Sequence, residues 1–377
     1  MILSDEQQMI RDTARAFARE VLAPGAAARA EAGAIEPAVL RQLGEMGFLG
    51  MSVPEELGGA GADYVSYALA LMEIAAGDGA VSTVMSVHNA PFNAILQRYG
   101  SPDQQERVLR PAARGDFIGA FALTEPQAGS DAAAIRTRAE LRNDRYVING
   151  EKVFITSGQI AGWVILFARL EGSSGKQGIT AFLTPTDAPG YQVTRIEQKL
   201  GQAASDTAAL RFDGLEVAAE NRIGDEGEGY RIALSSLETG RIGIAAQSVG
   251  MAEAALDVAL AYAQERTSFG KPLIEHQAVG FRLADARTRL EAARQLVLHA
   301  ASLKDAGRPC LTEAAMAKLY ASEAAERICS DAIQTLGGYG YTADYPVERI
   351  WRDVRVCQIY EGTSDIQKLL ILRGITG

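Results

Sequence analysis

The hydrophobic pattern changes twice along the chain, and this change constrains the fold more than any other feature. In the first part, apolar residues recur at helical steps of four, three and four: Ile10, Ala14, Phe17 and Val21. Ser4 and Gln7 have the spacing of a capping box at the start of this helix, and Pro24-Gly25 is predicted to end it. Residues 1–118 are therefore predicted to form a helical domain.

From about Gly119 the pattern becomes that of β-strands. Two β-rich runs, which together span Tyr146 to Thr156, flank Asn149-Gly150. Because Asn-Gly between such runs is the strongest short hairpin signal, we expect a hairpin turn there. Further strands are predicted at 163–170, 179–184, 191–195 and 207–217. Residues 119–228 are therefore predicted to form a small antiparallel β domain, a barrel or a sandwich.

After Gly229 the pattern returns to long helices. One stripe alternates steps of three and four: Leu283, Ala286, Leu290, Ala293, Val297 and Ala300. This stripe is typical of a helix packed in a bundle, and its small alanines permit close approach of neighbouring helices. The fold class is therefore α+β multidomain, with a helical domain over residues 229–377.

Composition and charge exclude several classes of function. The chain has 377 residues, of which 47% are hydrophobic and 22% charged, as in soluble globular proteins. Its net charge of −10 argues against nucleic-acid binding, which needs a basic face to neutralise phosphates. No run approaches the ~20 apolar residues of a membrane span. Residues 1–6 lack the basic and apolar regions of a signal peptide, so we expect a cytoplasmic protein.

Several common catalytic motifs do not occur. The three cysteines and three histidines are widely separated without metal-ligand spacing, so no metal site is expected. Gly337-Gly338-Tyr339-Gly340 follows a predicted helix, whereas a Rossmann loop follows a strand. Neither a Gly-x-Ser-x-Gly elbow nor a phosphate loop ending in Gly-Lys-Ser/Thr is found. Hydrolase and kinase functions are therefore disfavoured, and a nucleotide cofactor would be held in another way.

One carboxylate near the end of the chain is a candidate catalytic base. Glu361 lies beside Gly362 in the octapeptide Tyr360-Glu-Gly-Thr-Ser-Asp-Ile-Gln367. A glycine hinge lets a carboxylate reach into a cleft, and the apolar neighbours Ile359 and Tyr360 could desolvate it and raise its pKa. The alternative is a solvated glutamate at the start of a short helix, with Ser364 as the helix cap. The octapeptide alone leaves both interpretations open.

Five further segments are distinctive in their order and spacing: Phe121–Asp131, Lys152–Gly158, Arg266–Lys271, Gln334–Tyr341 and Tyr345–Asp353, which leads into the octapeptide. Taken together, they resemble the acyl-CoA dehydrogenase family along the whole chain, most closely its short-chain branch. The resemblance implies an N-terminal helical domain, a middle β-barrel and a C-terminal four-helix bundle. This layout agrees with the periodicity, and the predicted domains are 1–118, 119–228 and 229–377.

The resemblance also implies an FAD site. Its flavin wall would be formed by Phe121, Ala122, Leu123, Thr124, Gly129, Ser130, Phe154, Ile155 and Thr156. Arg266 would pair with the pyrophosphate, with Phe269 and Gln277 beside it. The adenine-nucleotide cradle would be formed by Gln334, Leu336, Gly337 and Gly338, supplied by a neighbouring subunit, and Thr363 and Asp365 would complete the contacts. The alternatives are a surface ion pair for Arg266 and a helix C-cap and turn for Gly337 and Gly338.

The resemblance implies that the substrate is an acyl-CoA, contacted by Ser130, Glu238, Arg241, Tyr360 and Gly362. The alternative for Glu238 and Arg241 is an exposed helical pair. Some branches place the base immediately before this arginine, where the chain has Gly240. The role of base therefore falls to Glu361, which removes the α-proton while a hydride passes from the β-carbon to flavin N5. The helix around 85–89 and the helix after Gly240 should line the acyl pocket.

The implied partners are electron-transferring flavoprotein as electron acceptor and further copies of the chain in a tetramer built as a dimer of dimers. Two alternatives stay open. One is dehydrogenation of an acyl thioester on a carrier protein in a biosynthetic pathway. The other is a catalytically silent flavin-binding protein, which the intact Glu361 motif disfavours.

Overall fold

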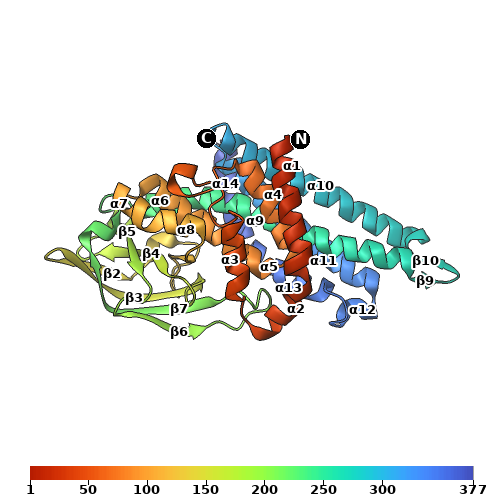
Figure 1. The fold of residues 1–377 in the computed structure, drawn as a ribbon, viewed down its shortest axis with the longest axis horizontal. Helices are drawn as coiled ribbons and strands as arrows, with labels where there is room; N and C mark the ends of the chain where they lie inside the picture. Colours follow the sequence, from red (N-terminus) through yellow and green to blue (C-terminus); the bar gives the residue numbers. More distant parts are fainter. Residues whose placement is uncertain (377) are drawn as a thin grey trace.

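The N-terminal part of the computed structural model, which describes residues 1–376, is helical (Figure 1). Its α-helices are α1 (Asp5–Phe17), α2 (Ala23–Ala32), α3 (Pro37–Glu45), α4 (Tyr64–Gly77), α5 (Gly79–Val87), α6 (Ala94–Tyr99), α7 (Pro102–Gln104) and α8 (Arg110–Arg114). Short 3₁₀ or π turns are η1 (Ala18–Leu22), η2 (Glu55–Leu57), η3 (His88–Asn93) and η4 (Gln105–Leu109). Helices α4 and α5 are buried along most of their length and form the core of this part.

The first helix begins as predicted but does not end where predicted. Ser4 and Gln7 form the capping box at the start of α1. At the other end, the chain continues through the π turn η1 directly into α2, with Pro24 in the first turn of that helix. Proline is tolerated there because a first-turn N–H has no partner within the helix. The prediction that Pro24-Gly25 ends the helix was therefore wrong; Gly33, with φ of 66°, ends α2.

The middle part is one eight-stranded sheet. Its strands are β1 (Gly119–Ala122), β2 (Arg138–Arg142), β3 (Arg145–Thr156), β4 (Trp163–Leu170), β5 (Ile179–Pro185), β6 (Tyr191–Ile196), β7 (Thr207–Ala218) and β8 (Arg222–Ile223). The short 3₁₀ turns η5 (Ala132–Ala134), η6 (Lys176–Gly178) and η7 (Ala219–Asn221) lie between them. The order is β6-β7-β3-β2-β4-β5-β8, and β1 pairs with β4. The four strands predicted after residue 160 are confirmed to within two residues at each end.

Two details of the predicted sheet were wrong. Strands β1 and β2 both run parallel to β4, so the sheet is mixed rather than wholly antiparallel. The predicted hairpin at Asn149-Gly150 does not exist, because β3 runs through it with a register shift against β7 between Ile148 and Gly150. The true hairpin joins β2 to β3, where Arg142 pairs with Arg145. Asn-Gly here marks a bulge, which is the other common use of glycine inside a strand.

The C-terminal part is a bundle of long helices. Its elements are α9 (Gly229–Glu265), the pair β9 (Thr267–Ser268) and β10 (Lys271–Pro272), η8 (Leu273–Glu275), α10 (Gln277–Asp305), α11 (Leu311–Leu336), α12 (Gly338–Tyr341), α13 (Val347–Val354), η9 (Arg355–Gln358) and α14 (Ser364–Thr376). All six residues of the predicted α10 stripe are buried. Helix α9 is long and apolar enough to cross a membrane, but 67% of its most apolar window is buried inside the protein, so it is a core helix.

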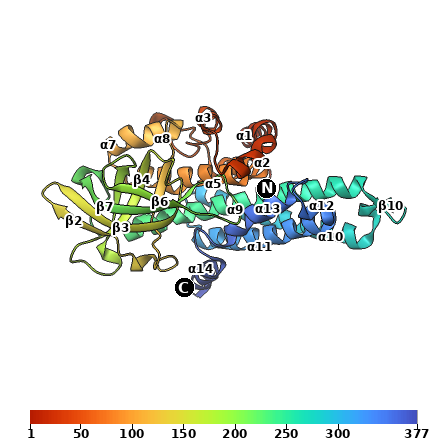
Figure 2. The same ribbon diagram turned by 90° about the horizontal axis from the view of Figure 1, so that it is seen from below.

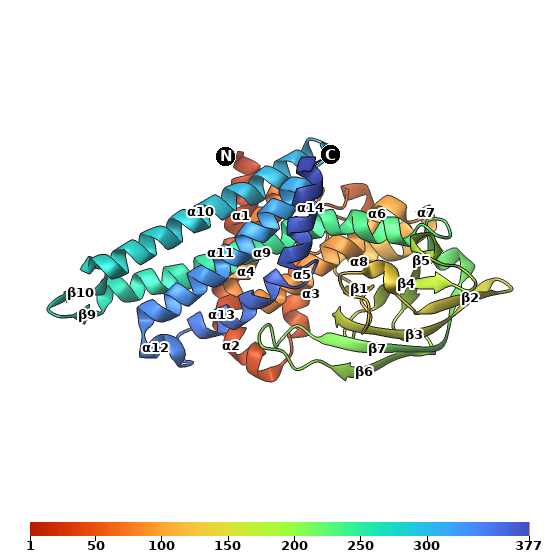
Figure 3. The same ribbon diagram turned by 180° about the vertical axis from the view of Figure 1, so that it is seen from behind.

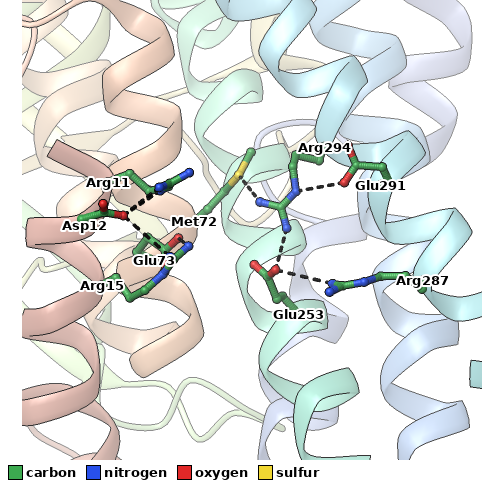
Figure 4. Close-up of polar contacts among 9 residues, drawn as sticks. All are labelled: Arg11, Asp12, Arg15, Met72, Glu73, Glu253, Arg287, Glu291 and Arg294. Carbon is green, nitrogen blue, oxygen red and sulfur yellow. Dashed lines mark hydrogen bonds and ion pairs between the residues drawn. The ribbon is translucent and has the colours of Figure 1, made fainter. Parts of the chain in front are cut away.

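The N-terminal helices pack on the bundle through apolar contacts, beside two groups of ion pairs, one within each part. Figure 4 shows Arg15 of α1 on Glu73 of α4, at 2.6 Å, and Arg294 of α10 on Glu253 of α9, at 2.8 Å. Arg294 also contacts the sulfur of Met72 on α4 at 3.6 Å. These contacts connect α1, α4, α9 and α10, so the helix that opens the chain is fixed against the bundle.

The molecule is elongated. In Figures 1 and 3 the β-sheet forms one end, and β9, β10 and α12 form the opposite end of the bundle. Figure 2, seen from below, shows the same separation. Helix α14 lies between these ends, on the part of the bundle nearer the sheet. The predicted fold, helical then β then helical, is confirmed, while the exact boundaries 1–118, 119–228 and 229–377 stay a prediction.

Candidate active site

Glu361 occupies an unusual backbone conformation just before α14. Its φ is +53° and that of Gly362 is +93°, so two successive residues are left-handed. For a glutamate this conformation is sparsely populated, and such residues cluster at functional sites. Thr363 caps α14 by accepting the N–H of Ile366 at 3.4 Å, rather than Ser364 as the alternative interpretation required. The backbone thereby turns the Glu361 side chain toward α9.

The carboxylate of Glu361 fits into a notch that exists because residue 240 is glycine. A β-carbon built on Gly240 would collide with Oε2 of Glu361 and would lie 2.8 Å from Cδ and 3.1 Å from Oε1. Oε2 itself is buried and makes no hydrogen bond within the described residues. The two positions therefore exclude each other: a side chain at 240 and this position of Glu361 cannot coexist.

The electrostatics of the notch favour a carboxylate that exchanges protons near neutral pH. Burial raises the pKa of Glu361 to about 7, while the positive charges of Arg241 and Lys318 lower it in part. Arg241 follows Gly240 on α9 and is 5% exposed, and its Nε has no partner in the described chain. Lys318 of α11 is fully buried. A base works best when its pKa lies near the working pH, so this environment suits proton abstraction.

The residue before the base is fixed by a buried hydrogen-bond network. The hydroxyl of Tyr360 donates to Oε1 of Gln247 on α9, and Nε2 of Gln247 donates to Oγ1 of Thr83 on α5 at 2.6 Å. Oγ1 of Thr83 in turn donates to Gln202 at 2.5 Å, in the loop between β6 and β7. Tyr360, predicted to bind substrate, therefore points its hydroxyl into the protein, and the network connects its loop to both other parts of the chain.

The two segments of the predicted flavin wall lie side by side. The N–H of Val153 donates to the carbonyl of Thr124 at 3.0 Å. The buried ammonium of Lys152 donates to the carbonyl of Leu123 at 2.9 Å and to Glu125 at 2.8 Å. A buried ammonium group is stable only when carboxylate or carbonyl oxygens accept its hydrogen bonds. The contacts of Lys152 with Leu123 and Glu125 therefore fix one segment against the other.

A second bulge in β3 presents an aromatic ring to solvent. The register against β7 shifts between Lys152 and Ile155, and Phe154 between them has φ of +59° and is 64% exposed. Its neighbours Ile155 and Thr156 are buried and half-buried. An exposed phenylalanine on a strained backbone beside half-buried Thr124 and Thr156 forms a surface that suits a planar ring with polar edges.

A separate open groove lies at the far end of the bundle. It encloses about 630 Å³, and Arg266, Leu336, Gly337 and Gly338 are among the residues that line it. Gly337 has φ of +61°, and no atom lies within 4 Å of a β-carbon built on it or on Gly338, so the backbone there is open to a ligand. Four predicted cofactor residues thus meet in one groove.

The predicted cofactor residues fall into two groups that lie far apart within one chain. Phe269, Gln277 and Gln334 are exposed around the far groove, and Phe269 is 96% exposed. Figures 1 and 3 place that end of the bundle opposite the sheet that carries the predicted flavin wall. Thr363 and Asp365 stay with Glu361 at the start of α14. A single extended cofactor within one chain would have to span the length of the bundle.

The predicted substrate residues also divide. Ser130 is exposed in the loop after β1, as is Gly129. Glu238 accepts a hydrogen bond from Lys304 at 3.4 Å, and also from Cys310 at 3.4 Å. It therefore faces α10 and α11, whereas Arg241 faces the notch with Glu361.

Family models account for nearly the whole chain. The model described as "Acyl-CoA dehydrogenase, N-terminal domain" matches residues 4–116, that of the middle domain matches 120–215, and that of the C-terminal domain matches 227–376. The chain belongs to the acyl-CoA dehydrogenase family. It is therefore an oxidoreductase of a family that depends on FAD.

Individual members agree with this assignment. The chain is 46% identical over 377 residues to "Acyl-CoA dehydrogenase" of Bacillus subtilis (strain 168), with 100% of both chains covered. It is 45% identical to the mitochondrial "Short-chain specific acyl-CoA dehydrogenase" of Rattus norvegicus, covering 98% of this chain and 90% of the relative. The solved butyryl-CoA dehydrogenase of Megasphaera elsdenii is 40% identical, with a TM-score of 0.98 and full coverage of both chains.

Two residues around this candidate site were missed in the sequence. Lys318 lies on the apolar stripe of α11, four residues after the buried Ala314 and three before the buried Ala321. A lysine on an apolar stripe is unusual, so this periodicity could have marked it. Gln247 gave no such signal, because an isolated glutamine in a long helix is common and its partners are distant in sequence.

Proposed function

We propose that this chain is a short-chain acyl-CoA dehydrogenase in which Glu361 removes the α-proton of an acyl-CoA thioester. The observation that carries the proposal is the desolvated carboxylate of Glu361, held in the Gly240 notch between two buried cations. A carboxylate with a pKa of about 7 accepts a proton far more readily than a solvated one. The product is a trans-2-enoyl thioester.

Each part of the chain has a task in this reaction. The loop before α14 aims the Glu361 carboxylate at the α-carbon, and the backbone N–H of Glu361 donates to the thioester oxygen, where negative charge develops. Phe121–Thr124 and Phe154–Thr156 would hold the flavin ring, with Gly129 and Ser130 beside them. FAD bound there would supply the acceptor for the hydride that leaves the β-carbon. Burial of the site excludes water and so strengthens the electrostatic contacts.

The cofactor site is proposed to be shared between two copies of the chain. The flavin wall and the far groove lie at opposite ends of one chain. A second copy could bring its own Arg266, Phe269 and Gln277, together with Gln334, Leu336, Gly337 and Gly338, to the flavin wall of the first. Arginine suits this task because its planar fork donates two parallel bonds to a pyrophosphate. We therefore propose a homo-oligomer, arranged as a dimer of dimers.

The preference for a short acyl chain is supported by close packing behind the base. A β-carbon on Gly243, one turn after Gly240, would lie 2.7 Å from Oγ of Ser86 and 2.9 Å from the hydroxyl of Tyr67. Both hydroxyls are buried and unpartnered within residues 1–376. Helices α4, α5 and α9 thus meet closely here, and this packing opposes entry of a long acyl chain.

Electron-transferring flavoprotein is the proposed electron acceptor. A chain that is 43% identical, with a TM-score of 0.98, belongs to a solved structure described as "Electron transferring flavoprotein of Acidaminococcus fermentans". We also propose a cytoplasmic location, because the one helix in residues 1–376 that is long and apolar enough to span a membrane is a core helix.

The test is anaerobic bleaching of the flavin absorbance. The purified yellow protein should bleach on addition of butyryl-CoA and should not bleach with palmitoyl-CoA at the same rate. Glu361→Gln should keep FAD and lose about 1,000-fold or more of the bleaching rate. Turnover near the wild-type rate by Glu361→Gln would contradict the assigned base, and bleaching only by a carrier-protein thioester would contradict the assigned substrate.

A further inference from the structure

We propose that Lys318 is a positioning residue for the catalytic base: its buried ammonium group holds the backbone on which Glu361 sits and supplies a positive charge beside the carboxylate. The inference rests on the proposed role of Glu361. It assigns a function to the hydrogen bond between Lys318 and this loop, which the reaction scheme above leaves unused.

Burial of the Lys318 ammonium group costs folding free energy, so its location calls for a functional explanation. Its side chain is fully buried on the apolar stripe of α11. Nζ donates to the carbonyl of Gly362 at 2.7 Å, and no carboxylate oxygen in residues 1–376 lies within 4.0 Å of it. Transfer of an ammonium from water into a protein interior is unfavourable unless charged or polar partners compensate. Among residues 1–376, the one hydrogen bond of its ammonium group goes to the loop of the base.

The carbonyl of Gly362 is held from two sides. Besides Lys318, the buried Gln367 of α14 donates from Nε2 to this carbonyl at 2.7 Å and to the carbonyl of Glu361 at 3.3 Å. These two donors fix a backbone in which Glu361, with φ of +53°, holds a conformation that is unfavourable for a glutamate in an unrestrained chain. Lys318 belongs to the rigid bundle, so it transfers the rigidity of α11 to the loop.

The charge of Lys318 acts on the same carboxylate. The titratable groups that face Lys318 are Glu361, Arg241 of α9, Cys357 of η9 and Glu323 of its own helix. Burial lowers the pKa of Lys318 to about 8, so the ammonium form prevails at pH 7. Its charge favours ionised Glu361 before the reaction, and after proton transfer two cations face a neutral acid. The base is thereby returned to its ionised form.

Two neutral variants separate position from charge. Lys318→Met removes both the donor and the charge, whereas Lys318→Gln keeps an N–H donor. In the FAD-loaded enzyme, both should move the rising limb of kcat/KM against pH upward by about one unit, because an opposite charge at contact range shifts a carboxyl by that amount or more. Lys318→Met should lose a further ~10-fold at the plateau, and Lys318→Gln less. Lys368→Met, which removes an exposed lysine of α14, is the matched control and should leave the limb in place.

A binding measurement tests the inference without turnover. A 3-oxoacyl-CoA has an acidic α-proton, so its dissociation constant, followed by the flavin absorbance, should depend on the protonation of Glu361. Lys318→Met should shift this pH dependence as it shifts kcat/KM. In a Glu361→Gln background, Lys318→Met should change the residual rate less than about threefold, because the lysine acts through the missing base.

The outcomes are distinct. If the rising limb of kcat/KM against pH stays in place in both Lys318→Met and Lys318→Gln, this inference is overturned and the role of Glu361 is left intact. Loss of FAD and of the thermal transition in both would also overturn it, because Lys318 would then stabilise the whole bundle. Full activity of Glu361→Gln would instead overturn the proposed base itself.

Discussion

The two ends of the helical bundle differ in how far one chain completes them. Near the sheet, the Glu361 carboxylate is enclosed by α9 and α11, and its Oε2 is buried. At the far end, the groove around Arg266 is open, and Phe269 is 96% exposed on a left-handed backbone. The first region is completed by contacts within the chain, whereas the second presents the side chains of Arg266 and Phe269 to solvent.

This difference indicates which part of the proposed reaction would need a second copy of the chain. Proton abstraction needs a base placed to within a fraction of an ångström, and such precision comes from rigid packing inside one chain. Cofactor binding tolerates a site assembled from two surfaces, because many distributed contacts share the energy. We therefore expect variants at the base end to act within a chain and variants at the far end to act across chains.

The largest expected effect follows from filling the notch. Gly240→Ala places a methyl group where Oε2 of Glu361 lies, so the carboxylate must move. We expect kcat with butyryl-CoA to fall by about 100-fold or more, since small misplacements of a base are that costly. FAD content should stay unchanged, measured by absorbance after purification. Thr239→Ala on the same helix is the control; equal losses in both variants would show that the helix, rather than the notch, is responsible.

The next effect tests whether the far end acts across chains. Arg266→Ala should weaken FAD binding by roughly 10- to 100-fold, because one charge-assisted contact to a phosphate is lost. Co-expression of Arg266→Ala with Glu361→Gln, each with its own affinity tag, gives mixed oligomers. In a mixed dimer, one site receives an intact base and an intact arginine, so about half the wild-type rate should return. A mixed dimer no more active than the Arg266→Ala parent at the same FAD concentration would place both residues in one site of one chain.

A smaller effect is expected at the flavin wall. Phe154→Ala removes the exposed ring on the β3 bulge, and we expect FAD retention to fall roughly 10-fold through lost stacking. Phe154→Tyr should retain FAD, since it keeps the ring. The measurement is the FAD-to-protein ratio after dialysis. Normal retention by Phe154→Ala would remove this residue from the cofactor site.

The smallest effect concerns stability and pH. The pKa of Glu361 is about 7 in the folded chain, above its value of ~4.3 in an unfolded one. The stability that this group contributes is therefore present below about pH 4 and is lost as pH rises through 7. Glu361→Gln cannot ionise, so it should raise the melting temperature at pH 8 by roughly 2–4 °C and much less at pH 5. An equal shift at both pH values would contradict the raised pKa.

Some predictions from local sequence patterns were confirmed, and those that relied on an ambiguous local signal were wrong. The capping box of Ser4 and Gln7, the buried stripe of α10 and the strand Trp163–Leu170 all follow from local patterns, and all are confirmed. The predictions at Pro24-Gly25 and Asn149-Gly150 were wrong because each local signal has two uses. Proline also starts helices, and a glycine in a strand also makes a bulge. The choice between such uses depends on what packs against the segment.

The sequence by itself determined the order of helical and β parts, the apolar face of most elements and the octapeptide that carries Glu361. Local periodicity encodes these features, because it sets which residues can leave water. Only the tertiary structure decided that Gly240 leaves the space for Glu361, that Lys318 holds its loop and that the far groove lies away from the flavin wall. These features join elements distant in sequence, and their contacts are fixed only when the helices pack.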